Sequence, residues 1–213
     1  MKKNLLNALK EIIHEANKLP FKEKVKFLND ARRMLHEDLS PFKNQPVDFV
    51  EWVPAENVVA NDYNPNKCAP PEYKLLKLSI KEDGYTMPIV SYKLDPEREV
   101  VDGFHRSKAG KEDQEINTEV YGFLPLTTIK KDKQERIAST IRHNRARGTH
   151  DIDLMSDLVA ELHRLGRSDQ WIAKNLGMDA DEVLRLKQIG GLADLFKDKE
   201  FSQSWEVVES KEV

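Results

Sequence analysis

The sequence predicts a mixed α/β domain, preceded by a helical hairpin and followed by an all-helical module. Short β-branched and aromatic runs alternate with helical patterns from residue 49 to 126, which indicates a sheet with helices. Two amphipathic stripes precede this region, and only helical patterns follow it. We therefore divide the chain into a hairpin, a linker, the central domain, a helical module and a tail, at residues 1–40, 41–48, 49–126, 127–198 and 199–213.

The first 40 residues predict two helices that are separated by Pro20. One apolar stripe consists of Leu5, Leu6, Leu9, Ile12, Ile13 and Ala16, and the other of Phe21, Val25, Leu28, Ala31 and Leu35. Each stripe must be buried somewhere. Either the helices pack on each other and on the central domain, or they form a docking surface for a partner or for a second copy in a homodimer.

The central domain begins with a predicted strand. Its patterns predict strands at residues 49–53, 87–92, 99–101 and 118–123, and a helix at residues 72–82. Gly84 is expected to end that helix.

The most informative segment is the turn after the strand at 99–101. Asp102 and Gly103 form a turn signal, and His105 and Arg106 open the next helix. Free N–H groups at a helix start favour phosphate, and a guanidinium fork grips two phosphate oxygens. Lys108 adds another cation. The segment therefore predicts a phosphate-binding turn, with an ordinary strand–turn–helix as the alternative.

The run VPAENVVANDYNPN, the segment EVVDGFHRSKAG and the run IRHNRARG together resemble the ParB chromosome-partition proteins. The resemblance covers residues 49–192 and implies a fold shared with sulfiredoxins and archaeal free serine kinases. The whole pattern is most similar to ParB-like coactivators of prophage gene expression of the immunoglobulin-binding-regulator B type. It implies a transcriptional regulator of phage or prophage genes that acts beside a phosphoadenosine-phosphosulfate-reductase-like partner protein.

The resemblance also implies a nucleoside triphosphate, CTP or ATP, with Mg²⁺ as a possible companion. Gly103 and Arg106 match the first phosphate motif of partition proteins, with Lys108 at a later basic position. Asn144 and Arg147 match the second motif, which is expected to approach the Gly103 turn. Sulfiredoxins have a catalytic cysteine where this chain has Phe104, so their chemistry is not predicted.

The serine-kinase relatives offer a second function, because Asp102 to Arg106 satisfies their Asp-Gly-x-His-Arg motif. Their catalytic base aligns with Asp62, which would deprotonate a substrate hydroxyl. The alternative for Asp62 is a plain turn. We favour a non-enzymatic regulator and keep a small-molecule kinase using ATP or ADP as the alternative.

The carboxy-terminal third predicts a helix-turn-helix. Helices are expected at residues 131–145, 151–165, 168–176 and 179–189, with Gly177 at the turn. The candidate DNA contacts are Arg167, Lys174, Arg185 and Lys187. Acidic Asp179, Asp181 and Glu182 at the start of the second helix oppose tight binding, because phosphate attraction dominates affinity for DNA. Sequence-specific binding, weak binding helped by a partner, and no binding all stay open.

Composition narrows the classes of protein to which this chain can belong. The formal net charge is −3, and one cysteine, Cys68, excludes an internal disulfide. No apolar run approaches the roughly 20 residues of a membrane span. A bacterial or phage-encoded cytoplasmic protein is expected, and no metal ligand is predicted, because His143 and His150 have weak spacing support.

Overall fold

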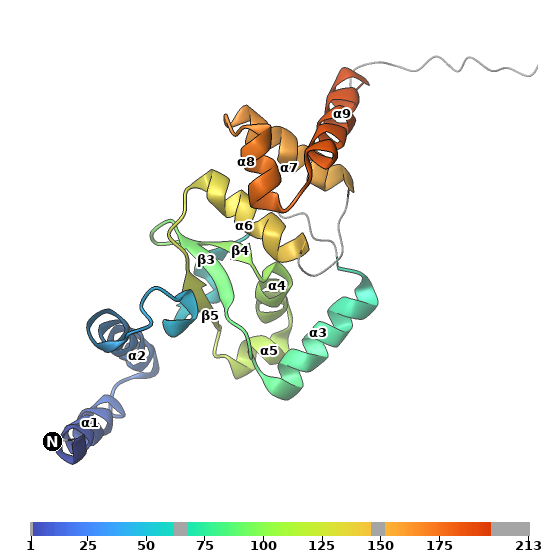
Figure 1. Ribbon diagram of the computed structural model, residues 1–213. Coiled ribbons are helices and arrows are strands. Elements are labelled where there is room, and N and C mark those ends of the chain that lie inside the picture. The colour runs from blue at the N-terminus through green and yellow to red at the C-terminus, as the bar shows by residue number, and fades with distance from the viewer. Residues whose placement is uncertain (1, 62–67, 146–151, 197–213) are drawn as a thin grey trace, which may run out of the picture. The chain divides into compact units, whose positions relative to one another are not determined.

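The computed structural model describes residues 2–61, 68–145 and 152–196 (Figure 1). The chain divides into two compact units, Met1–Gly148 and Thr149–Val213, which are described separately below. The helix at 133–145 belongs to the first unit, whereas the sequence-based boundaries place it in the helical module.

The first unit contains a five-stranded mixed sheet in the order β1-β5-β3-β4-β2. Its strands are β1 (Glu51–Pro54), β2 (Val58–Val59), β3 (Ile89–Lys93), β4 (Arg98–Asp102) and β5 (Phe123–Thr128). β1 pairs with β5 and β3 pairs with β4 in antiparallel fashion, while β3–β5 and β2–β4 are parallel. The mixed α/β class predicted from the sequence is confirmed.

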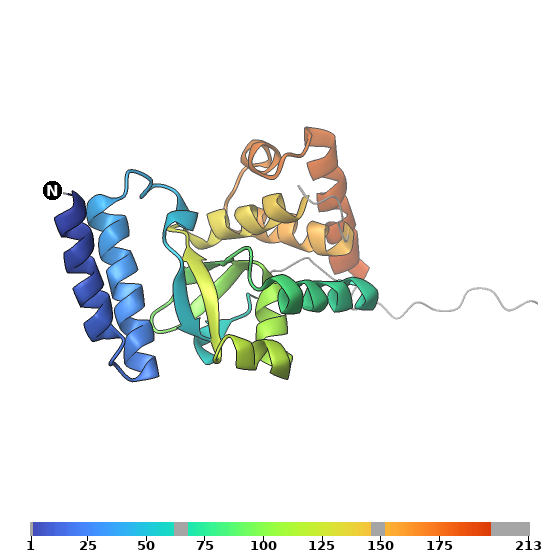
Figure 2. The same ribbon diagram turned by 90° about the horizontal axis from the view of Figure 1, so that it is seen from below.

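The helices of this unit are α1 (Lys2–Ala16), α2 (Phe21–Met34), α3 (Pro70–Asp83), α4 (Phe104–Glu112), α5 (Gln114–Glu119) and α6 (Lys133–Arg145). Short helical turns are η1 (Leu35–Leu39), η2 (Pro46–Asp48) and η3 (Ala55–Asn57). The helices α3, α4 and α5 gather on one side of the sheet, and α2 lies on another (Figures 1 and 2).

Strand β4 is buried on both faces, because α4 and α6 cover it from opposite sides. Val100 joins the core cluster against which Phe104 of α4 packs. The neighbouring Glu99 instead pairs with Arg136 of α6, with Nε 3.1 Å from Oε1. Successive side chains of a strand point to opposite faces. The end of β4 is therefore enclosed between these two helices.

The strand predicted at 118–123 is wrong. Residues Gln114–Glu119 form α5, whose start is capped by Asp113, which accepts a hydrogen bond from the Ile116 N–H. Tyr121 and Gly122 have φ of 54° and 75° and form a turn, so β5 begins only at Phe123.

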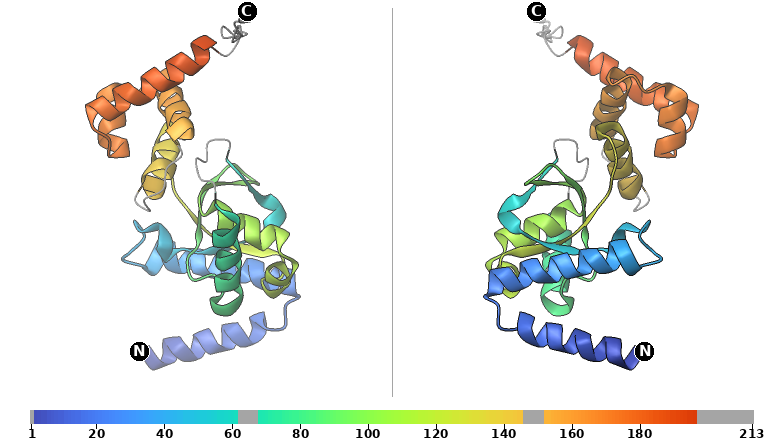
Figure 3. Two further views of the ribbon diagram at one scale, coloured as in Figure 1. Left: turned by 90° about the vertical axis from the view of Figure 1, so that its right-hand side faces the viewer. Right: turned by 90° about the vertical axis from the view of Figure 1, so that its left-hand side faces the viewer.

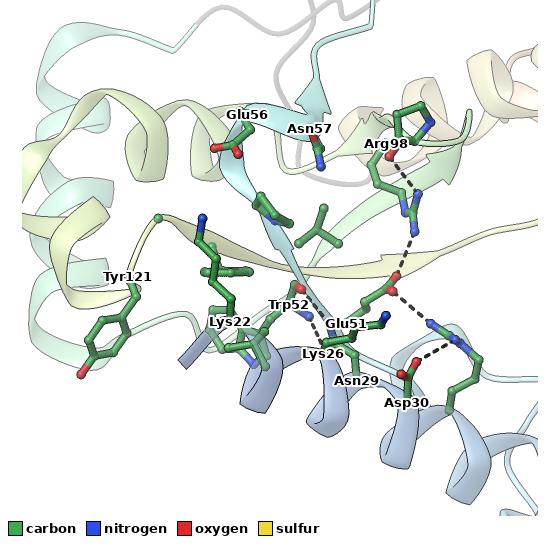
Figure 4. Close-up of a pocket in the computed structure, with 17 residues that line it drawn as sticks. Lys22, Lys26, Asn29, Asp30, Glu51, Trp52, Glu56, Asn57, Arg98 and Tyr121 are labelled. Atoms are coloured by element: carbon green, nitrogen blue, oxygen red, sulfur yellow. Dashed lines mark hydrogen bonds and ion pairs between the residues drawn. The ribbon is translucent and has the colours of Figure 1, made fainter. Parts of the chain in front are cut away.

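Helix α2 closes the free edge of β1. The Asn29 side chain donates to the Trp52 carbonyl (2.8 Å) and accepts from the Trp52 N–H (3.0 Å), so one amide replaces a pairing strand. Beside this contact lies a pocket of about 610 Å³, lined among others by Lys22, Lys26 and Arg98 (Figure 4). The expected packing of the hairpin on the central domain therefore holds for α2.

The second unit is helical, with α7 (Ile152–Arg164), α8 (Asp169–Leu176) and α9 (Ala180–Phe196) (Figure 3). Its buried apolar side chains are Met155, Leu158, Val159, Leu162, Ile172, Leu176, Met178, Val183 and Leu186. The Ser156 hydroxyl donates to the Leu186 carbonyl at 2.7 Å and fastens α7 to α9. A Cβ on Gly190 would approach Ser156 Oγ to 2.9 Å, so this glycine permits the close crossing.

Candidate functional site

Gly103 connects β4 directly to α4. Its φ of 89° lies in the left-handed region, which favours glycine. A Cβ at this position would also come within 2.8 Å of Arg106 Nη2. The chain therefore needs glycine here both for the turn and for the close approach of the arginine.

The Arg106 side chain folds back over Gly103 towards the end of β4. Its Nη2 lies 3.6 Å from Oδ2 of Asp102, a residue that is only 8% exposed. Because Asp102 holds the guanidinium, an anion at the start of α4 has to compete with this carboxylate for Arg106.

Helix α6 reaches the same carboxylate. His143 Nδ1 lies 3.5 Å from Asp102 Oδ2. The Thr140 hydroxyl donates to the Val101 carbonyl at 2.8 Å in a buried setting, which fixes α6 against the last residues of β4. The structure therefore brings together the Gly103 turn and the helix that carries the second predicted motif.

His105 and Lys108 lie further along the first turns of α4, next to Tyr73 of α3. The His105 and Tyr73 ring centroids are 6.1 Å apart, and Lys108 Nζ is 5.6 Å from the Tyr73 ring. Burial lowers the pKa of His105, and the charge of Lys108 lowers it further. His105 is therefore a neutral hydrogen-bonding group at neutral pH rather than a cation.

Three predicted site residues are not placed. Asp62, Arg147 and the side chain of Asn144 lie outside the described part of the chain. The kinase alternative depends on Asp62 and gains no supporting observation.

The structure adds a supporting residue that the sequence analysis did not select. The Tyr85 hydroxyl donates to the Arg106 carbonyl at 2.9 Å and so supports the first turn of α4 from below. Burial is the largest cause that raises the pKa of Tyr85 to about 12, so the hydroxyl keeps its proton. No local pattern marks this contact, because its partner lies 21 residues away.

Arg136 of α6, which precedes the second predicted phosphate motif, is not accessible to an anion. It is buried, pairs with Glu99 and lies 3.8 Å from the centroid of the Tyr92 ring. Its role in the fold is to join α6 to the sheet.

The second unit has the features of a helix-turn-helix. Ser168 caps α8 by accepting a hydrogen bond from the Trp171 N–H (3.2 Å), and Gly177 turns the chain with φ of 66°. Asp179 accepts from the Glu182 N–H at 2.6 Å and starts α9. The acidic first turn of α9 is therefore an N-terminal cap, which stabilises the helix.

The four predicted DNA contacts differ in their surroundings. Lys174 on α8 and Arg185 on α9 are exposed. Lys187 is instead 3.0 Å from both carboxylate oxygens of Asp169, and the Arg167 guanidinium lies 4.4 Å from the centre of the Trp171 ring. Of the two predicted DNA contacts on α9, Arg185 is therefore the one whose side chain is exposed to solvent.

The described residues offer neither a metal site nor a membrane span. Among the side chains that the structure describes, no group of three or more His, Cys, Asp or Glu residues could hold a metal ion. None of the helices within the described ranges is long and apolar enough to cross a membrane.

Comparison with known proteins identifies relatives of both units. The family described as the IbrB-like C-terminal HTH domain matches residues 150–198. The chain is also 50% identical over 190 residues to the Uncharacterized protein YbdM of Escherichia coli (strain K12), covering 89% of this chain and 90% of YbdM. The chain belongs to the YbdM family. The helix-turn-helix predicted from the sequence is confirmed by the IbrB-like match.

Two solved structures of the C-terminally truncated chromosome-partitioning protein ParB from Caulobacter crescentus are also similar. The complex with CTP-gamma-S has a TM-score of 0.40 and 18% identity, and covers 70% of this chain and 86% of that chain. The complex with the centromeric parS site has a TM-score of 0.45 and 18% identity, with coverages of 64% and 69%.

Proposed function

We propose that the protein is a nucleotide-responsive regulator that associates with DNA. The carboxy-terminal unit contributes the DNA contact, because it carries an IbrB-like helix-turn-helix domain. The α/β unit contributes the nucleotide site. The observation that carries this second part is the shared carboxylate of Asp102, at which the Gly103 turn and α6 meet.

The N-terminus of α4 supplies the phosphate site. Its first N–H groups have no partner within the helix and point outward with the positive end of the dipole. When a phosphate binds there, Arg106 exchanges Asp102 for the phosphate oxygens. Asp102 is then a positioning residue that keeps Arg106 and His143 close to the turn, not a phosphate ligand. His105 contributes a hydrogen bond.

The nucleotide that we expect is CTP or ATP, from the sequence resemblance. A divalent cation does not fit Asp102, because this carboxylate is already shared by Arg106 and His143. We therefore assign no role to Mg²⁺ at this turn. The reductase-like partner and the coactivation of phage or prophage genes stay predictions of the same resemblance.

Replacing Arg106 with alanine is expected to weaken nucleotide binding by roughly 10- to 100-fold, the range for losing charged hydrogen bonds. Calorimetric titration of the full chain with CTP, ATP and ADP measures the effect. Lys93→Ala is the control, since Lys93 is exposed and lies at the far end of the strand next to β4. The nucleotide site is refuted if wild-type protein binds none of the three, or if R106A binds as tightly as wild type.

Replacing Arg185 with alanine is expected to lower DNA affinity several-fold. One lost phosphate contact also reduces the slope of log affinity against log salt by about 1. Fluorescence anisotropy with duplex DNA at several salt concentrations measures both. Arg164→Ala is the matched control, because Arg164 is an exposed cation of α7 that already pairs with Glu161. Equal effects of R185A and R164A would contradict a role of α9 in DNA contact, whatever the nucleotide titration shows.

A further inference from the structure

Helix α1 is amphipathic, yet the structure buries none of its residues. Five large aliphatic side chains lie along it with 47% to 67% of their surface exposed: Leu5, Leu6, Leu9, Ile12 and Ile13. A helix of 15 residues is marginal in water unless its apolar face packs against something. Of the two alternatives for the hairpin, packing of its helices on each other therefore leaves about half of the α1 stripe uncovered.

Helix α1 lies at the outside of the first unit (Figure 2). Helix α2 lies between α1 and the sheet in every view of the first unit (Figures 2 and 3). The ion pair between Glu15 near the end of α1 and Lys18 just beyond it, at 2.6 Å, is local and adds little, because both side chains are exposed.

The apolar pattern of α1 is symmetric about Leu9. Leu5 and Ile13 lie four residues to either side, and Leu6 and Ile12 lie three residues to either side. Six residues away the charges are opposite, with Lys3 on one side and Glu15 on the other. If two copies of α1 pair in antiparallel fashion around a two-fold axis at Leu9, the five large aliphatic residues of each copy face aliphatic residues of the other. Lys3 of each copy then faces Glu15 of the other.

We propose that α1 pairs with α1 of a second copy of this chain in that antiparallel register. A two-fold interface uses the same patch on both subunits. The aliphatic residues of α1 meet that requirement, because they have the same spacing on both sides of Leu9. A heterologous partner would not need this symmetry. The proposal is independent of the nucleotide site, and it places two helix-turn-helix units in one particle.

The α1 stripe alone offers a small interface. At roughly 80 Å² each, a little under half of a large side chain, its five exposed aliphatic side chains supply up to about 400 Å² per copy, against about 800 Å² per partner in a standard interface. The other six exposed large hydrophobic residues within the first 39 residues lie on α2 and η1, outside the α1 stripe.

The mass of the full chain in solution tests the proposal. Light scattering after gel filtration is expected to give twice the chain mass of 24.6 kDa for wild type. Leu9→Glu places two carboxylates at the axis and is expected to give the single-chain mass. Since Leu9 is exposed within one chain, L9E is expected to keep the wild-type circular dichroism. A wild-type protein of single-chain mass, or an L9E protein that stays dimeric, would overturn the proposal.

A charge exchange tests the register. Lys3→Glu alone puts two acids opposite each other and is expected to weaken the dimer several-fold, as is Glu15→Lys. The double variant K3E/E15K restores opposite charges across the axis and is expected to recover wild-type association. If the double variant is as weak as the sum of the single variants, the antiparallel register is wrong.

A cross-link tests whether the partner is a second copy. In a Cys68→Ser background, Leu9→Cys brings two thiols together at the axis, and mild oxidation is expected to give a disulfide-linked dimer on a non-reducing gel. Glu11→Cys lies on the opposite side of the helix and is the control. Equal cross-linking of the two variants, or none with L9C, would count against the contact.

Discussion

Gly110→Ala is expected to destabilise the α/β unit by about 2 to 3 kcal/mol, the upper part of the range for overpacking a core. A Cβ at this position of α4 would lie 2.5 Å from Leu124 Cδ2 and closer still to the Tyr85 hydroxyl. Both neighbours are held in place, Leu124 in the sheet and Tyr85 by its hydrogen bond to the Arg106 carbonyl. Urea unfolding followed by circular dichroism measures the loss.

Two controls separate the clash from the general effect of alanine in a helix. Gly191→Ala in α9 meets nothing within 4 Å and is expected to stabilise its unit slightly, because alanine is the better helix former. Tyr85→Phe removes one of the clashing atoms, so G110A is expected to cost less in that background. If G110A costs the same with and without the Tyr85 hydroxyl, the tyrosine is not the obstacle.

The same contact links the core to the candidate site. Tyr85 supports the carbonyl of Arg106, so a displaced Tyr85 shifts the first turn of α4. We therefore expect G110A to weaken nucleotide binding as well, even at temperatures at which the variant is still folded.

Local chemistry explains which parts of this fold could be predicted from the sequence. The turn at Gly103 and the start of a helix at Ser168 each depend on a few adjacent residues, and the structure places both as predicted. The helix expected at 151–165, which is α7, and the break at Gly177 are equally local. These features needed no knowledge of distant segments.

The prediction failed where a local pattern had two interpretations. The hydrophobic residues Val120, Tyr121 and Phe123 resemble a strand, yet Asp113 caps a helix just before them and the chain turns at Gly122. The true strand β5 contains Pro125 and lies between β1 and β3, where proline is rare.

Ion pairs between distant segments could not be predicted. Lys187 was predicted to contact DNA, but the fold brings Asp169 to it, and it brings Glu99 to Arg136 in the same way. The partners are 18 and 37 residues away. Charge density along the sequence therefore overstates the positive charge that the folded protein presents to an anion.

Glu51→Ala is expected to destabilise the α/β unit by about 3 kcal/mol, because it leaves a buried charge without its carboxylate. Arg98 of β4 is 9% exposed, and its Nη2 lies 3.2 Å from Glu51 Oε2. The other Glu51 oxygen lies 3.2 Å from Arg33 Nη2 of α2 (Figure 4). Urea unfolding measures the loss, with Asp30→Ala as control, because its pair with Arg33 is exposed and contributes only about 0.5 kcal/mol.

A double variant shows whether the buried charge is the cause. Glu51→Leu with Arg98→Met removes both charges and is expected to cost less than E51A alone, since an apolar pair of similar volume often replaces a buried ion pair without loss. Should the double variant be worse than E51A, the loss comes from packing instead. Glu51 also fastens α2 to the sheet, and α2 carries α1. E51A is therefore expected to leave the proposed α1 dimer intact while loosening its connection to the domain, so that association and unfolding respond separately.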